Sequence, residues 1–194
     1  MDMAETSHPA SWHAIIDAAE MEFLERGYAG VRMEHVATRA GYNKSLVYRH
    51  FGGREGLWDA VLERVAARRG TPQHPLPGTV AELLAVLARR LDADRAGTRL
   101  LLGSAGQDDA PEVGADRAAY HEEMVGLVQV LQASGELEPE FDSGLFYLVL
   151  LGMASTPVMM PHVARAVSGM DTESEAFRDR WEDTLVWLAD TIAG

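Results

Sequence analysis

The sequence predicts an all-α protein built from a small N-terminal helical domain and a larger C-terminal one. Apolar residues recur at intervals of three and four along most of the 194 residues, which is the period of an amphipathic helix. No run of alternating apolar and polar residues between turn residues predicts a strand. The stretch GTPQHPLPG, residues 70–78, holds three prolines and divides the helical pattern in two.

The first helix is expected to begin with Ser11 as its N-cap and to end near Gly27. Its apolar residues form one stripe at helical spacing: Trp12, Ile15, Ile16, Ala19 and Phe23. A second, two-turn helix follows around Val36. Gly41 should end it, because a residue without Cβ tolerates the left-handed conformation at a helix C-terminus.

A third short helix and a long fourth helix complete the N-terminal pattern. Asn43 is placed to cap the third helix, and Gly52 with Gly53 closes it. Arg54 then opens the fourth helix, which connects the domains over residues 54–69.

The domain boundary is expected at the proline-rich stretch. Residues 1–56 are predicted to form the N-terminal domain and residues 71–194 the C-terminal domain. Further helices are expected at residues 80–94, 97–105, 113–133, 141–154, 161–167 and 175–192.

Composition excludes several classes of protein. The chain has no cysteine, so disulfide scaffolds, thiolate zinc sites and cysteine nucleophiles are excluded. The N-terminus lacks the basic and apolar regions of a secretory signal. The longest apolar run, residues 145–154, is about half of the ~20 residues that cross a bilayer. We therefore expect a cytoplasmic protein.

Charge is distributed unevenly along the chain, whose formal net charge is −13. Residues 71–194 hold eight basic and twenty acidic residues, whereas residues 1–70 hold nine and ten. Between Arg26 and Arg54, six basic residues face only Glu34, and one of the six is the chain's only lysine. This basic segment favours an anionic partner.

Spacing within the basic segment predicts a helix-turn-helix motif. Ala37 is the small residue where two helices would cross, Gly41 makes the turn, and Val47 would lock the second helix onto the first. Val47 and Phe51, four residues apart, should face inward. The outward side chains are all hydrogen-bond donors: Lys44, Ser45, Tyr48 and Arg49. A short helix with such a face suits the major groove of DNA.

The run GYAGVRMEHVATRAGYNKSLVYRHFGGREGL, residues 27–57, carries a family resemblance. It is similar to the N-terminal DNA-binding domain of the TetR family of bacterial transcriptional regulators, through Gly-Tyr, Val-Ala, Ala-Gly, Val-Tyr, His-Phe and Arg-Glu-x-Leu in that order. With the first helix, the likeness covers about 45 residues. It implies a ligand-responsive regulator, most commonly a repressor, that binds a palindromic double-stranded DNA operator.

The resemblance also implies roles for individual residues. Tyr48, His50 and Arg54 would hold phosphates, while Asn43, Lys44 and Ser45 would approach base edges. The chain departs from the family at residues 31–33, Val-Arg-Met, where threonines usually cap the second helix. Arg32 is expected to contact phosphate in their place. The complete expected DNA-binding set is Arg32, Tyr42, Asn43, Lys44, Ser45, Tyr48, Arg49, His50 and Arg54.

A two-turn recognition helix spans few base pairs, so useful affinity requires a dimer that reads two half-sites. The last predicted helix carries a regular apolar stripe, and residues 145–154 are apolar on nearly all sides. The resemblance pairs these two helices across a two-fold axis, although the same stripe could be ordinary core. The expected homodimer interface comprises Leu145, Leu148, Phe177, Trp181, Leu185, Leu188 and Ile192.

The resemblance further implies a small-molecule effector in the C-terminal domain, and nine methionines favour a hydrophobic one. The candidate lining residues, each of which could instead be plain core, are Leu101, Tyr120, Met124, Leu127, Phe146, Met153 and Trp187. No cofactor or metal is expected.

Three alternatives remain open at this point. An enzyme is disfavoured, because no Gly-rich phosphate loop, Gly-x-Ser-x-Gly or His-Glu-x-x-His occurs. A metal-responsive regulator is possible in principle, but the seven histidines include no His-x3-His pair. The third alternative is a helical protein-interaction module without a small organic effector.

Overall fold

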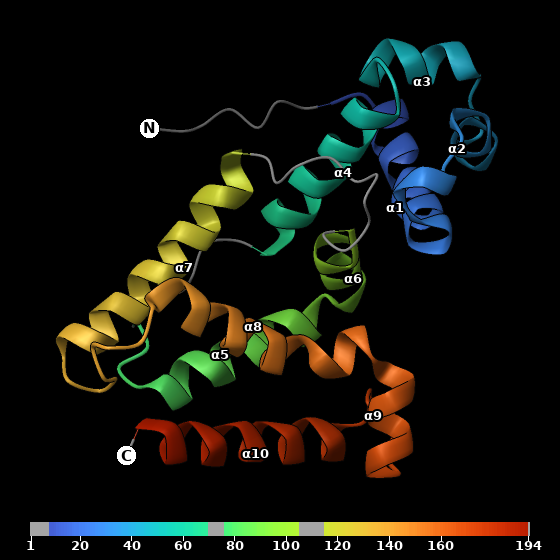
Figure 1. The fold of residues 1–194 in the computed structure, drawn as a ribbon. Helices are drawn as coiled ribbons and strands as arrows, with labels where there is room; N and C mark the ends of the chain where they lie inside the picture. Colours follow the sequence, from blue (N-terminus) through green and yellow to red (C-terminus); the bar gives the residue numbers. More distant parts are fainter. Residues whose placement is uncertain (1–7, 70–75, 105–114, 194) are drawn as a thin grey trace. The chain divides into compact units, whose positions relative to one another are not determined.

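The computed structural model describes residues 8–69, 76–104 and 115–193, which form ten helices and no strand (Figure 1). The prediction of an all-α fold is confirmed. The helices are α1 (Ala10–Gly30), α2 (Met33–Ala40), α3 (Lys44–Phe51), α4 (Arg54–Arg69), α5 (Val80–Ala93), α6 (Arg95–Ser104), α7 (Ala115–Ala133), α8 (Ser143–Met159), α9 (Pro161–Ser168) and α10 (Glu175–Ala193).

The chain divides into two compact units. The first holds the residues up to Arg68 together with a second segment that begins at Leu100. The second holds the remaining residues, including α5 and α7 to α10. Residues 70–75, which contain most of the predicted linker, lie outside the described residues.

The core of the first unit collects the apolar faces of α1 to α4. Ile15 and Ile16 of α1 meet Val36 of α2, Val47 of α3 and Trp58 of α4, all of them buried. Trp58 also packs edge-on against the Phe23 ring, with ring centroids 4.7 Å apart. Burying this apolar surface is what holds three short helices, each marginal alone, in a fixed arrangement.

The first helix differs from its prediction at both ends. It begins at Ala10 with Pro9 at the N-cap position, so Ser11 lies in the first turn and is not the cap. Regular helix is interrupted at Gly27, whose φ of 69° lies in the left-handed region, and one further turn continues to Gly30. The predicted end at Gly27 is therefore a kink within α1.

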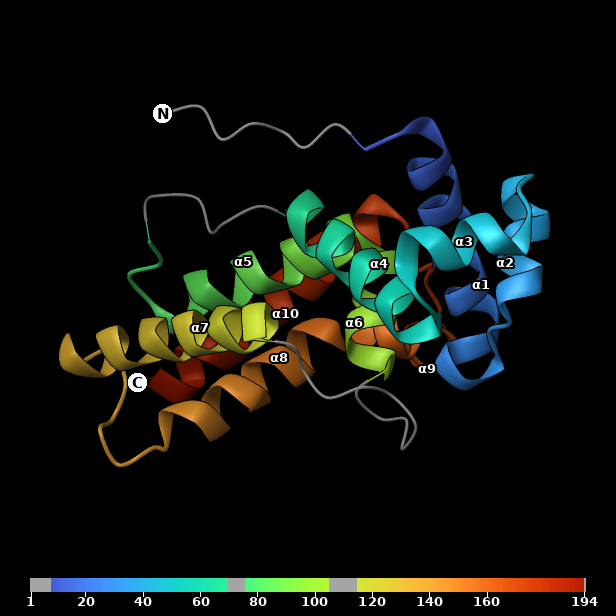
Figure 2. The same ribbon diagram turned by 90° about the horizontal axis from the view of Figure 1, so that it is seen from above.

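In the second unit, α5 packs against both α8 and α10, and α7 packs against α8 (Figure 1 and Figure 2). Its core contains Leu83, Leu84 and Leu87 of α5, Leu150 of α8 and Leu185 of α10. Thr79 caps α5 by accepting a hydrogen bond from the backbone N–H of Glu82 at 3.1 Å.

The later helices match their predicted order, with shifted ends. Asp94 accepts a hydrogen bond from the Gly97 N–H at 2.9 Å, so α6 begins at Arg95, two residues earlier than expected. Asp142 caps α8, which therefore starts after Phe141, and the helix continues through Pro157 to Met159. The predicted start of the helix at residue 113 lies outside the described residues.

In the described part of the chain, no single helix is both long and apolar enough to cross a membrane. Only α8 and α9 together reach the required length and composition, and they are bent by 83° with respect to each other.

Candidate nucleic-acid interface

Local sequence fixes the turn and the start of α3. Gly41 ends α2 with φ 75°, and the Tyr42 N–H donates to the Ala37 carbonyl at 3.0 Å, which completes a Schellman-type turn. The Asn43 Oδ1 accepts a hydrogen bond from the Leu46 N–H at 2.9 Å and so caps α3. Both predicted roles, the left-handed glycine and the asparagine cap, are confirmed.

The two faces of α3 separate as the spacing predicts. Val47 and Phe51 are buried in the first core, and Ala37 of α2 is buried in the same core. The exposed side chains of α3 are Lys44, Ser45, Tyr48 and Arg49. The helix therefore presents two cations and two hydroxyls to solvent, while Val47 and Phe51 fix its opposite face in the core.

Lys44 has a protein partner in this structure. Its Nζ pairs with the carboxylate of Glu34 on α2 and lies 5.6 Å from the centroid of the Tyr48 ring. The hydrogen bond from Lys44 lowers the pKa of Glu34, and the same bond raises the pKa of Lys44. To contact DNA, Lys44 would have to leave Glu34 or donate to Glu34 and DNA at the same time.

The expectation of an almost unopposed basic segment is wrong. Arg39 Nε lies 2.8 Å from Glu22 Oε1, and its Nη2 lies 2.6 Å from Glu25 Oε2. Arg26 Nε lies 2.8 Å from the other oxygen of Glu22. These carboxylates precede the counted segment, and the packing of α2 on α1 brings them to Arg39. With the Lys44–Glu34 pair, three of the six cations are thus paired within the unit.

Arg54 has structural contacts at the start of α4. It donates to the Ala29 carbonyl at 3.1 Å, and its guanidinium lies 4.6 Å from the centroid of the Tyr28 ring. These contacts tie α4 to the last turn of α1. The expected phosphate contact would use the remaining N–H groups, and it stays a prediction.

Arg32, Tyr42 and His50 border the α3 face. Arg32 is exposed at the N-cap position of α2 and makes no capping hydrogen bond with its side chain, as expected where the family threonines are missing. Tyr42 is exposed. The half-buried His50 ring shares a hydrogen bond of 3.1 Å with the hydroxyl of Ser11, which links the end of α3 to α1.

The pattern analysis missed Glu22 and Glu25 as partners of these cations, and it did not pair Glu34 with Lys44. The Glu22–Arg26 pair has the i,i+4 spacing of a helix-surface ion pair and could have been found from sequence. The pairs of Arg39 and Lys44 join different helices, so they depend on how the helices pack.

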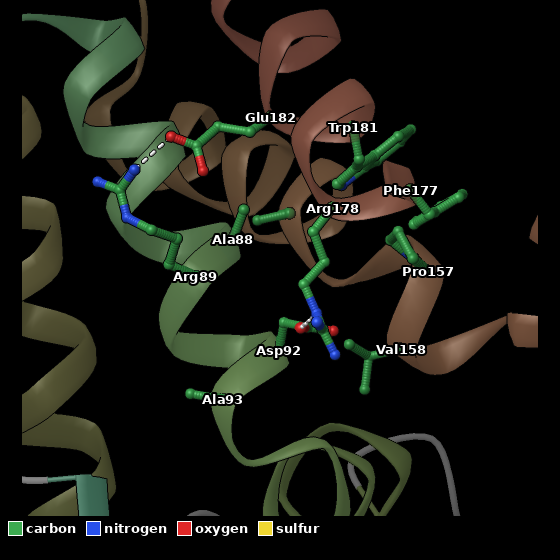
Figure 3. A pocket seen from close by; sticks show the side chains of 11 residues that line it. Ala88, Arg89, Asp92, Ala93, Pro157, Val158, Phe177, Arg178, Trp181 and Glu182 are labelled. Atoms are coloured by element: carbon green, nitrogen blue, oxygen red, sulfur yellow. Dashed lines mark hydrogen bonds and ion pairs between the residues drawn. The ribbon is translucent and has the colours of Figure 1, made fainter. Parts of the chain in front are cut away.

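The structure does not bring the predicted effector-binding residues together. Leu101 packs against the core of the first unit, and Trp187 is 65% exposed. The others belong to the second core or pack against it: Tyr120, Met124, Leu127, Phe146 and Met153. The second unit does contain a pocket, but between α5, α8 and α10, and none of these residues lines it (Figure 3).

The predicted dimer stripe on α10 requires a correction. Phe177 and Leu185 are buried within the protomer, because this face of α10 packs on α5. Trp181 and Leu188 are half-buried. The exposed large apolar side chains of these two helices are Leu145, Leu148 and Val149 on α8 and Trp187 and Ile192 on α10.

Titratable side chains do not gather into a metal-binding group in the described residues. There, no set of three or more His, Asp or Glu side chains is placed to hold an ion.

Comparison with known proteins bears on the class of this site. The family model described as bacterial regulatory proteins, tetR family, matches residues 15–61. The HTH-type transcriptional repressor SCO4008 of Streptomyces coelicolor is 27% identical over 184 residues, which cover 91% of this chain and 94% of that protein.

Two solved structures share the fold. The transcriptional regulator SCO4942 from Streptomyces coelicolor superposes with a TM-score of 0.72 at 22% identity, over 94% of this chain and 97% of that one. AibR in complex with isovaleryl coenzyme A and operator DNA superposes with a TM-score of 0.64 at 17% identity, over 92% and 97% of the two chains.

The geometry of α2 and α3 and these likenesses agree on the class of protein. It is a helix-turn-helix transcriptional regulator and not an enzyme. The family model, the relative and the shared fold support a TetR family regulator.

Proposed function

We propose that the protein is a repressor that binds an inverted-repeat DNA operator as a homodimer and leaves it when a small molecule binds. The exposed face of α3 carries this proposal, since its donors stand on a helix fixed by buried Val47 and Phe51. The name of the 27%-identical relative, a transcriptional repressor, supports the direction of regulation.

On the operator, Lys44, Ser45 and Arg49 are the side chains proposed to reach base edges in the major groove. Lysine and arginine donate to guanine O6 and N7, and a hydroxyl serves either strand. Asn43 uses its side-chain oxygen for the cap, which leaves its amide N–H groups as donors. Tyr48 and His50 are proposed to contact phosphates together with three flanking residues: Arg32, Tyr42 and Arg54.

The homodimer is proposed to form through the exposed apolar side chains of α8 and α10. Leu145 and Leu148 are 64% and 59% exposed, and Val149 is 54% exposed on the same helix. Trp187 and Ile192 provide apolar surface on α10. Large apolar side chains are costly to leave in water, and where several stay exposed they commonly mark an interface.

Release by an effector follows from linkage between two binding sites. AibR, which shares the fold, was solved with both isovaleryl coenzyme A and operator DNA. We propose that residues 71–194 bind the effector and form the dimer, while residues 1–56 bind DNA. Effector and operator must then weaken each other's binding by the same factor.

Selection from random duplex DNA with the purified full-length protein tests this function. The enriched sequences should contain an inverted repeat whose half-sites lie about 34–36 Å apart or an equivalent multiple. Affinity for the winner should fall steeply as salt rises, because phosphate contacts release counterions. Folded protein that enriches no sequence at low salt would contradict operator binding.

A further inference from the structure

A pocket of about 360 Å³ lies between α5, α8 and α10 in the second unit. Its walls are mostly apolar and come from Ala88 of α5, Pro157 and Val158 of α8, and Phe177 and Trp181 of α10 (Figure 3). The volume falls within the range of small-molecule sites.

Side-chain size explains why these helices leave a hollow. Ala88 and Ala93 on α5 and Ala154 on α8 line it at positions where longer side chains would fill it. On the opposite side, the rings of Phe177 and Trp181 stack nearly parallel, with an interplanar angle of 11° and centroids 6.3 Å apart. A flat or branched apolar group could pack between these rings and the alanines.

Two ion pairs border the pocket, Arg89 with Glu182 and Arg178 with Asp92 (Figure 3). Arg178 donates to Asp92 Oδ2 through Nε at 2.7 Å, and its two Nη groups have no bond to any described residue. The other oxygen of Asp92 is occupied by Arg95. Both oxygens of Asp92 are therefore paired with arginines, whereas the Arg178 fork still offers donors.

Trp181 presents its ring to the pocket. Its indole Nε1 has almost no accessible surface and no hydrogen-bond partner among the described residues, so a ligand would meet the ring and not this donor. Trp181 follows Arg178 by three residues on α10, so the two side chains are neighbours on the helix surface.

We propose that this pocket binds a small carboxylate with a compact aryl or branched apolar body. The apolar body packs against Trp181, Phe177 and the alanines, and the carboxylate accepts from the Nη groups of Arg178. An amine of the same shape would compete at Asp92 with Arg178 and Arg95, which already donate to its two oxygens. The regulatory role of this ligand rests on the proposed function, whereas its binding does not.

The indole N–H signals of full-length protein labelled on tryptophan nitrogen test the proposal directly. Three probes share one body and differ in charge: phenylacetate, phenylacetamide and 2-phenylethylammonium. The variant Trp181→Phe identifies the Trp181 signal, because that signal disappears from its spectrum. Phenylacetate should shift this signal saturably, and further than it shifts the other tryptophan signals. The amide should bind at least about tenfold more weakly, because it lacks the charge that strengthens a hydrogen bond to arginine.

Two arginine variants on α10 make the test specific. Arg178→Gln should weaken phenylacetate binding at least about tenfold, since it removes a charged donor pair. Arg180→Gln, a change at an exposed arginine of the same helix, should leave it unaltered. An unmoved Trp181 signal at millimolar phenylacetate, equal binding of the ammonium probe, or full binding by Arg178→Gln would each overturn the proposal.

Operator affinity, measured separately with and without phenylacetate, distinguishes the two proposals. A saturable Trp181 shift with unchanged operator affinity would support the pocket and contradict release by its ligand. If phenylacetate weakens operator binding by the wild type but not by Arg178→Gln, both proposals are supported.

Discussion

At the scale of single residues, the helix-turn-helix joins features of two kinds. The Asn43 cap and the left-handed Gly41 depend on a few neighbouring residues, and both were predictable from sequence. The Lys44–Glu34 pair depends on the angle between α2 and α3, which local spacing does not set. An exposed pair of this kind contributes little to stability, so its main consequence is for binding.

Glu34→Gln should strengthen operator binding by about fivefold at most, because Lys44 would no longer give up an exposed ion pair on meeting DNA. The melting temperature should hardly change. Fluorescence anisotropy with labelled operator measures the effect, and Glu63→Gln, at an exposed acid of α4, serves as the control. Unchanged or weaker binding by Glu34→Gln would show that Glu34 does not compete with DNA for the lysine.

At the scale of helices, α4 is joined to its neighbours through unusually close backbone contact at Gly56. A Cβ added there would lie 2.2 Å from the Phe51 carbonyl oxygen, whereas one added at Gly53 would meet nothing within 4 Å. The glycines that end α3 were recognisable as turn residues, but Gly56 lies inside a helix pattern and its role required the packed structure.

Gly56→Ala should destabilise the protein by at least about 3 kcal/mol, because the clash is with backbone and no side chain can move to relieve it. Gly53→Ala should change the free energy of unfolding by less than about 1 kcal/mol. Urea denaturation followed by circular dichroism compares the two. Equal stability of both variants would contradict the close approach of α4 to α3.

The carboxylate of Glu20 on α1 links this helix to α4, in addition to the contact between Arg54 and Ala29. Arg68 binds it in bidentate fashion at 2.8 and 2.9 Å, and Arg64 also donates to it. Burial acts to raise the pKa of Glu20, but the hydrogen bonds from Arg68 and Arg64 outweigh it and leave the pKa below its ordinary value. The ionised form therefore stabilises the folded state, and this contribution is lost as pH falls through the folded pKa.

Glu20→Gln should lower the free energy of unfolding at pH 7 by about 1.5–3 kcal/mol, the usual value of hydrogen bonds to a charged group. The difference from wild type should shrink once the pH drops below about 4.3, the value for an unperturbed glutamate. Thermal melts across this range measure it, with Glu63→Gln as control. A difference that stays constant down to acid pH would mean that Glu20 does not act through its charge.

At the scale of the whole molecule, the sequence separated helices from linkers well but did not separate core from interface. The apolar stripe of α10 around Phe177 and Leu185 has a spacing that fits a core helix and an interface helix equally well. In the structure, α5 covers this stripe. On α8, apolar residues surround the helix, so no stripe marks which side faces a partner. Only packing within the protomer shows that Leu145, Leu148 and Val149 remain exposed.

If the proposed dimer forms through α8, Leu148→Arg should convert it to monomer at micromolar concentration, because a charge would then lie in a desolvated apolar interface. The protomer should stay folded, since this side chain has no role in the core. Light scattering after size-exclusion chromatography gives the mass. Met21→Arg changes a comparably exposed apolar residue of the first unit and should remain dimeric. A dimeric Leu148→Arg would place the interface elsewhere.

The central claim, that the exposed face of α3 reads DNA sequence, is tested most directly by affinities for a panel of operators with single base-pair changes. Wild type, Lys44→Ala, Arg49→Ala and Tyr48→Phe would be compared at one salt concentration. Lys44→Ala or Arg49→Ala should lose about 1–3 kcal/mol of discrimination at one base pair of each half-site, whereas Tyr48→Phe should weaken all operators alike. If every variant kept the wild-type preference at every position, α3 would not be the element that reads the operator.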